Sequence, residues 1–111
     1  MTKPGRGFTG GFAEFQRQAM RIQRKLETLQ EELKTRQQEA TVGGGKVTAV
    51  VSGGKEVVSV RIDPSMLKPE EAEMLQDMVV SAVNAALKKV DEMIDAETNK
   101  ITGGLKIPGL T

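Results

Sequence analysis

Residues 12–33 read FAEFQRQAMRIQRKLETLQEEL, and the apolar side chains among them recur at gaps of alternately three and four residues. The seam positions are Phe12, Phe15, Ala19, Ile22, Leu26, Leu29 and Leu33. This spacing is typical of a heptad seam, a stripe that is narrower than the apolar face of a helix on a globular core. A narrow seam has to be covered by a second helix. The stretch therefore predicts a long helix of coiled-coil type, which strong helix formers continue to about Gln38.

A row of basic residues follows the same predicted helix. Arg17, Arg21 and Arg24 are spaced four and three residues apart, so they share one side of the helix. Lys25 lies on the neighbouring row. One interpretation is the solvated flank of a coiled coil, and the other is contact with DNA phosphates, which positions a duplex without reading its sequence. Because the chain has no Trp or Tyr to stack on bases, single-stranded DNA and RNA loops are less favoured partners.

Charge is distributed unevenly, although the formal net charge is only +1. Residues 1–25 hold six basic residues, Lys3 and Arg6 among them, against the single carboxylate of Glu14, a balance of +5. Residues 68–100 hold four lysines against eight carboxylates, a balance of −4. The basic end favours an anionic partner, and we expect Lys3 and Arg6 to add electrostatic attraction to it.

The residue types present favour no catalytic site, cofactor site or metal site. The chain has neither Cys nor His, which removes thiolate chemistry and the usual general base at neutral pH. Glycines 43–45 followed by Lys46 look like a phosphate loop, but Val47 replaces the required Ser or Thr and the run opens a strand. The carboxylates within residues 70–77 suit a solvated helix start. We expect no enzymatic activity and no small-molecule substrate.

Length and composition bound the location and the assembly of the chain. The first residues, MTKPGRGFTGGF, lack the apolar run of a signal peptide, and no stretch approaches the roughly 20 apolar residues that span a bilayer. We therefore expect a soluble intracellular protein with no membrane partner. The 111 residues include only three Phe, so a monomer has little bulk with which to fill a core, which favours obligate association.

A β-hairpin is predicted after the first helix. Glycines 43–45 break the helical pattern, and residues 46–51 and 56–62 then alternate between apolar and polar side chains. The glycine pair 53–54 suits the positive φ angles of a two-residue turn. Residues 39–42 are a weaker third strand, so the predicted antiparallel sheet has two or three strands.

The two-residue turn implies a register for the hairpin. It pairs Ala49 with Val58 and gathers the apolar side chains on one face of the sheet. On the polar face it sets Lys46 opposite Arg61, where like charges are unfavourable. Two side chains splayed into water are the favoured explanation, and an anion or acidic surface between them is the alternative. The other predicted pairs are Val51 with Glu56 and Val47 with Val60.

A second long helix is predicted from Pro69 to about Thr98. Asp63-Pro64 ends the preceding strand, because proline cannot donate to the ladder. Pro69 suits the first position of a helix. A wide apolar stripe over residues 72–94 predicts that this helix packs on the apolar face of the sheet.

The order of these elements defines an α+β fold with a long N-terminal helix, a small antiparallel sheet and a long C-terminal helix. Residues 1–11 are rich in Gly and are expected to be a flexible arm. Residues 12–101 form a single α-β-α domain, and residues 102–111 are a Gly/Pro-containing tail.

Seven segments in this order carry a resemblance to a known family. They are QAMRIQRKLETLQEEL (18–33), GGGKV (43–47), VRIDPS (60–65), EMLQDMVV (73–80), AVNAALKK (82–89), TGGL (102–105) and PG (108–109). Each motif alone is weak, but together they are specific and span all but about the first ten residues. On them the chain resembles the YbaB/EbfC family of nucleoid-associated DNA-binding proteins.

The resemblance implies a homodimer whose long helices project from a shared body like tweezers. It also implies binding of double-stranded DNA with little sequence preference, organisation of its conformation with an effect on gene expression, and a place at the nucleoid in the bacterial cytoplasm. No catalytic motif carries over, and no cofactor is expected. No motif position identifies a DNA contact, so the candidates rest on charge and spacing: Arg17, Arg21, Arg24, Lys25, Lys3 and Arg6. The alternative function is a homodimeric helical protein–protein interaction module without direct DNA binding.

Overall fold

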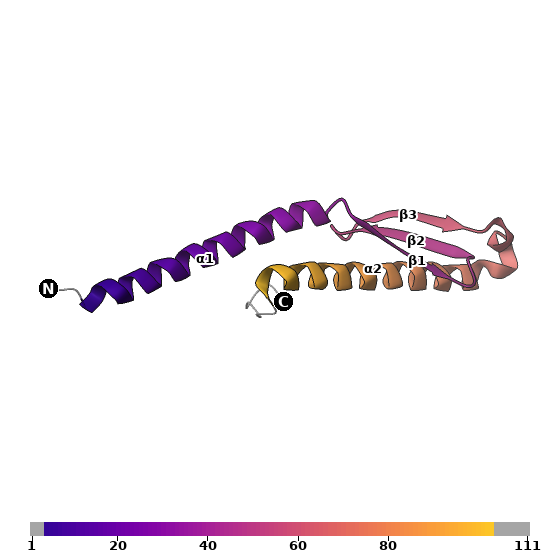
Figure 1. Cartoon of the computed structure of the whole chain (residues 1–111). Coiled ribbons are helices and arrows are strands. Elements are labelled where there is room, and N and C mark those ends of the chain that lie inside the picture. Colours follow the sequence, from indigo (N-terminus) through magenta and orange to yellow (C-terminus); the bar gives the residue numbers. More distant parts are fainter. Residues whose placement is uncertain (1–3, 104–111) are drawn as a thin grey trace.

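The computed structural model describes the backbone of residues 4–103 and the side chains of residues 11–103. The chain is elongated, with extents of 86 × 19 × 17 Å, and its first helix runs on beyond the end of its last (Figure 1). The elements are α1 (Pro4–Leu33), β1 (Gln37–Val42), β2 (Val47–Ser52), β3 (Val57–Ile62), the short 3₁₀ turns η1 (Pro64–Met66) and η2 (Pro69–Glu71), and α2 (Ala72–Thr102). The predicted α+β fold, with two long helices around a three-stranded antiparallel sheet, is confirmed.

The first helix differs from its predicted bounds at both ends. It begins at Pro4 and not near Phe12, so the backbone of residues 4–11, expected as a flexible arm, is helical. Proline presets the φ angle of a first helical position, and each glycine after it costs only about 1 kcal/mol relative to Ala. The helix ends at Leu33 and not near Gln38, because residues 37–42 pair with β2 as the third strand. That weaker strand prediction is confirmed with longer bounds.

The sheet has the order β1-β2-β3, and its predicted hairpin register is wrong by two residues. Ala49 pairs with Val60, not Val58, and a bulge lies between Val50 and Val51. The connection is longer than the two-residue turn that was predicted, with Lys55 at a φ of +64°. A shift of two residues preserves the faces, because side chains alternate with period two.

The corrected register separates Lys46 from Arg61. Arg61 pairs with Thr48 across the ladder and forms an ion pair of 3.4 Å with Glu39 of β1. The Lys46 Nζ donates to the Ser65 hydroxyl at 2.9 Å instead. The predicted juxtaposition of like charges is therefore wrong, and no anion site is needed to explain it.

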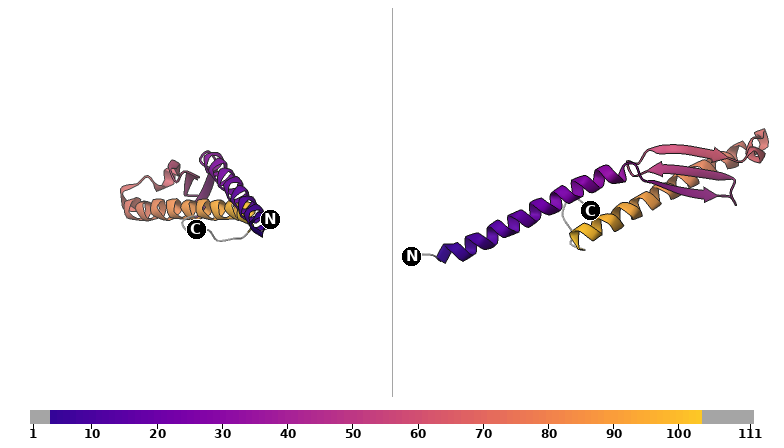
Figure 2. Two further views of the ribbon diagram at one scale, coloured as in Figure 1. Left: turned by 90° about the vertical axis from the view of Figure 1, so that its left-hand side faces the viewer. Right: turned by 45° about the horizontal axis from the view of Figure 1, so that its top comes forward.

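The core lies between α2 and one face of the sheet (Figure 2). Val47 and Val51 of β2 are fully buried, as are Ala82 and Val90 of α2. The small alanine side chain allows the helix to approach the strands closely. The predicted packing of the second helix on the apolar face of the sheet is confirmed.

The base of α1 is fastened to the rest of the chain by α2 and by the β2–β3 turn. Leu26 and Leu33 are buried in the contact with α2, which runs antiparallel to α1 (Figure 1). The backbone N–H of Gly53 donates to the Arg36 carbonyl at 2.8 Å, and a Cβ at this position would overlap the Leu33 carbonyl. The turn thus closes on the end of α1 at a place where only glycine fits. Because Leu26 and Leu33 are buried against α2, the second helix that the seam requires is α2 of the same chain, at the C-terminal end of α1.

Candidate nucleic-acid interface

The three arginines of the predicted row lie exposed on α1, on the side away from α2. Leu26 marks the side of α1 that faces α2. At about 100° per residue, Arg17, Arg21 and Arg24 lie roughly 140–200° around the helix axis from it. All three are exposed. The structure therefore brings them together as one outward row, which we call the arginine row.

Arg17 differs from the other two members of the row because it has an acidic partner. Its guanidinium lies 2.9 Å from the Glu14 carboxylate, with both side chains more than half exposed. The hydrogen bond from Arg17, and next the charge of Arg17, lower the pKa of Glu14, so this carboxylate stays ionised. Arg21 and Arg24 form no ion pair with any residue in the described part of the chain.

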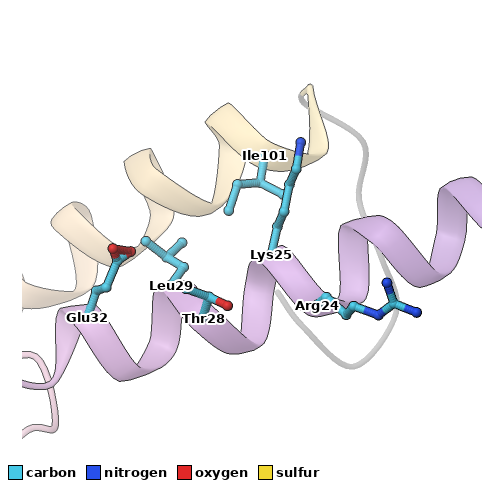
Figure 3. Close-up of a pocket in the computed structure, with 6 residues that line it drawn as sticks. All are labelled: Arg24, Lys25, Thr28, Leu29, Glu32 and Ile101. Atoms are coloured by element: carbon cyan, nitrogen blue, oxygen red, sulfur yellow. The ribbon is translucent and has the colours of Figure 1, made fainter.

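Lys25 lies beside the arginine row, not in it. Together with residues of both helices it lines a hollow of ≈ 320 Å³ between α1 and the last turn of α2 (Figure 3). The close-up shows the Lys25 side chain extending past Ile101, while the Arg24 guanidinium turns away from α2. The lining residues are Arg24, Lys25, Thr28, Leu29, Glu32 and Ile101.

The two remaining candidates lie near the start of the chain. Lys3 is outside the described residues. Arg6 lies within α1, and its side chain is outside the described part. Because Arg6 precedes Arg17 by eleven residues, about three turns, its backbone position continues the line of the arginine row. Arg6 therefore lies in a helix and not in the flexible arm that was expected, and its proposed role of attracting an anionic partner is unaffected.

Several basic residues elsewhere in the molecule are bound to acceptors of the chain itself. Lys55 pairs with Asp91 at 3.0 Å, and Lys89 donates to the Glu39 carbonyl at 2.8 Å. A hydrogen bond from Lys100, supported by Arg36, lowers the pKa of Glu97. These cations are paired within the body, whereas Arg21 and Arg24 project from it unpaired with any of the described side chains.

Sequence reasoning missed the link between Arg36 and Glu97, whose charged groups lie 3.6 Å apart where α1 meets the body. Their separation of 61 positions matches no helical or strand period, so no local spacing could have revealed it. This ion pair joins the C-terminal end of α1 to α2 and is not part of the arginine row. We call α1 the arm.

Two negative observations bear on other classes of site. Within residues 11–103, no group of three or more acidic, His or Cys side chains is placed to hold a metal ion. Neither long helix, over the residues described, has the apolar length that a bilayer crossing requires.

The fold and the arginine row together define a class: a small α+β protein with a projecting helix whose outer face is basic. The YbaB/EbfC DNA-binding family matches residues 9–105, and the chain belongs to this family. The resemblance read from its motifs is confirmed.

Relatives and a solved structure agree with this assignment. A nucleoid-associated protein of Acetivibrio thermocellus is 50% identical over 105 residues, which cover 94% of this chain and 93% of the relative. A nucleoid-associated protein of Thermoanaerobacter sp. is 49% identical over 106 residues, covering 94% and 96%. The crystal structure of an uncharacterized protein from Helicobacter pylori is similar in fold, with a TM-score of 0.59 and 31% identity, over 68% of this chain and 87% of that one.

Proposed function

We propose that the chain is a nucleoid-associated protein that binds double-stranded DNA through the outer face of α1. One observation carries the proposal: Arg21 and Arg24 are exposed on the projecting helix, and neither is paired with an acidic group of the described residues. Guanidinium groups in one row suit the regular phosphates of a duplex. The family membership and the names of the relatives support DNA as the anion and the nucleoid, in the cytoplasm, as the location.

The proposed contacts are with the DNA backbone. Arg17, Arg21 and Arg24 would bind phosphates, with Lys25 at the side of the row. Lys3 and Arg6 would extend the attraction toward the start of the chain. Phosphate contacts fix the position of a protein on a duplex but carry no sequence information. We therefore infer little sequence preference, and we infer organisation of DNA, with an effect on gene expression, as the outcome of many such contacts.

A salt titration with several duplexes of unrelated sequence tests this function. We expect the logarithm of the binding constant to fall linearly with the logarithm of the salt concentration, with one slope for all duplexes, because counterions are released from the phosphates. Fluorescence anisotropy of labelled duplexes measures it. Absence of binding at about 0.15 M salt would contradict the proposal and favour a helical protein–protein interaction module.

A substitution of Glu14 tests the same surface through an expected gain of DNA affinity. Its carboxylate holds the Arg17 guanidinium, so Glu14→Gln removes a negative charge and releases Arg17 for a phosphate. An exposed ion pair is weak, and we therefore expect DNA affinity to rise by no more than about fivefold. Anisotropy at low salt measures the change. Glu31→Gln is the matched control, because Glu31 pairs at the same distance and spacing with Lys34, which is not a member of the arginine row. Equal effects of the two variants would contradict the role of Arg17.

We also propose that the protein acts as a homodimer, joined through the edge of its sheet at β3. The two edge strands differ in how they resist pairing with another chain. β1 carries the polar Gln37 and the charged Glu39 near its start, and a charge on an edge strand discourages pairing with another chain. β3 instead opens with Val57 and Val58, which are 51% and 49% exposed. α2 lies chiefly beneath β1 and β2, which leaves this end of β3 uncovered.

Charge placed at the β3 edge should separate the two copies. We expect Val57→Lys combined with Val58→Lys to convert a dimer to a monomer, because unpaired ammonium groups would be buried at the interface. Light scattering coupled to size-exclusion chromatography measures the mass. Gln37→Lys with Thr41→Lys at the opposite edge is the control, which keeps the ion pair of Glu39 with Arg61 and should leave the mass unchanged. A dimer that survives the valine substitutions, or that is lost with the control, would place the interface elsewhere.

A further inference from the structure

The seam of α1 is covered at its base and open beyond it. Leu26 and Leu33 are buried against α2, but α2 ends at Thr102, and Phe12 and Phe15 remain 57% and 66% exposed. Removing side chains of this size from water is favourable. A line of such residues on a projecting helix indicates a surface with an occupant. We call the uncovered part, formed by Phe12, Phe15, Ala19 and Ile22, the distal seam.

The segment that follows α2 in the sequence has the residue pattern of such an occupant. Leu105 and Ile107 alternate with Gly104 and Lys106, as in an extended chain with one apolar side. Pro108 restricts the backbone to conformations that extended segments adopt. Leu110 is a third large apolar residue, which the same alternation places on the side of Lys106. The pattern therefore offers Leu105 and Ile107 to a surface and directs Lys106 away from it.

The position at which α2 ends suits this segment to the distal seam. The last turn of α2 places Ile101 beside Leu29 and Lys25, at the border between the covered and the uncovered seam (Figure 3). Gly103, in the left-handed conformation with a φ of +64°, then ends the helix. The hollow lined by these residues lies where the chain leaves α2.

The length of the segment matches the length of the distal seam. Leu26 and Phe12, the far end of the distal seam, are fourteen residues apart, which is about 21 Å along a helix. Seven residues from Gly103 to Leu110 span up to about 23 Å when extended. Ile107 falls about 13 Å from Gly103, close to the level of Ala19, which lies about 10 Å from Leu26.

We propose that residues 105–110 lie extended along the distal seam of the same chain as a strap. The segment is tethered within reach of the seam, so its effective concentration there is in the millimolar range, which favours it over a free second copy. The strap would cover Ile22, Ala19 and Phe15 in turn. It would leave the arginine row, on the other side of α1, open to DNA.

A cysteine pair tests the strap directly, because the chain has no cysteine of its own. In the full chain, Ala19→Cys with Ile107→Cys should form a disulfide within one chain under oxidised glutathione. Arg17→Cys with Ile107→Cys is the control, since position 17 lies at a similar depth but about 200° around the helix. Free-thiol titration and non-reducing denaturing gels measure the bonds. Equal rates for the two pairs, or disulfides mainly between chains, would overturn the proposal.

Amide hydrogen exchange provides a second measurement that requires no new bond. With Leu105→Ser, Ile107→Ser and Leu110→Ser together, we expect at least tenfold faster exchange within residues 12–22, because the helix loses its cover. Exchange within β2 should not change. Unaltered exchange in residues 12–22 would overturn the strap. Neither readout involves DNA, so the failure of the strap and the failure of DNA binding are distinguishable.

Discussion

We expect that replacing Arg17, Arg21 and Arg24 together by Ala weakens the binding of duplex DNA of every sequence and flattens its salt dependence. All three are exposed on one side of α1, and Arg24, which lines the hollow beside Ile101, turns its guanidinium away from α2. Each phosphate contact adds about 0.9 to the slope of log K against log salt, so three lost contacts lower the slope by about 2.7. Between about 50 and 200 mM salt, the native protein would lose about fortyfold more affinity than the variant.

The control for this variant removes the same number of positive charges from the body. Lys55, Lys68 and Lys88 are exposed, and their replacement by Ala changes the net charge equally. We expect this control to alter the slope by less than about one phosphate contact. If both variants weaken binding alike, the interaction depends on total charge and not on the arginine row. A variant with Lys at positions 17, 21 and 24 should retain most of the slope, because an ammonium group also neutralises a phosphate.

The periodic elements of the fold could be predicted because their patterns repeat over many residues. The apolar seam from Phe12 to Leu33 fits the period of a helix and no other regular structure, and so does the wide apolar stripe of α2. The alternation in β2 and β3 fixed the faces of the sheet even though the register was wrong. From Val47 to Val50 the pairing is shifted by two residues, which keeps each side chain on its face, and the alternation breaks only at the bulge, where Val51 pairs with Val57. The facial pattern alone therefore does not determine the pairing.

The details that were missed depend on contacts between distant residues. The turn at Gly53 is set by its approach to the Leu33 carbonyl, which a local reading of two glycines cannot include. Arg36 and Glu97 meet only because the two helices run antiparallel. In both cases tertiary structure decides between local alternatives of similar free energy. The early start of α1 at Pro4 is different, because it follows from a proline that presets the first helical position and from glycines that cost only about 1 kcal/mol each.

The candidate site was also predictable only in part: its periodic spacing was, and its contacts with other elements were not. The spacing of Arg17, Arg21 and Arg24 placed them on one side of a helix, and the structure has them there. Spacing alone could not say that this side faces away from α2, because that depends on which residues α2 contacts. It also could not show that Lys25 extends past Ile101 while the neighbouring Arg24, which lines the same hollow, turns away from α2 (Figure 3).

The second large effect is expected at the base of the arm. Leu33 is 3% exposed, lies in the contact between α1 and α2, and carries the carbonyl on which the Gly53 turn closes. Leu33→Ala should lower the free energy of unfolding by about 2–5 kcal/mol, a large share of the about 5–15 kcal/mol that is typical of a small protein. Urea denaturation followed by circular dichroism measures this loss. Because Leu33 joins the arm to the body, α1 should also exchange its amide hydrogens faster than β2 does.

Two further variants separate packing at this site from general effects on the helix. Met20→Ala removes a comparable side chain from α1 where it is 52% exposed, and we expect a change below about 0.5 kcal/mol. Leu33→Met nearly conserves the volume and should cost less than about 1.5 kcal/mol. If Leu33→Ala is no more costly than Met20→Ala, then α1 is not held by its base and can swing freely against the body. If Leu33→Ala costs more free energy of unfolding than Leu33→Met and Met20→Ala, the packing of Leu33 both stabilises the chain and fixes the orientation of α1. The direction in which the arginine row faces is then determined by the fold.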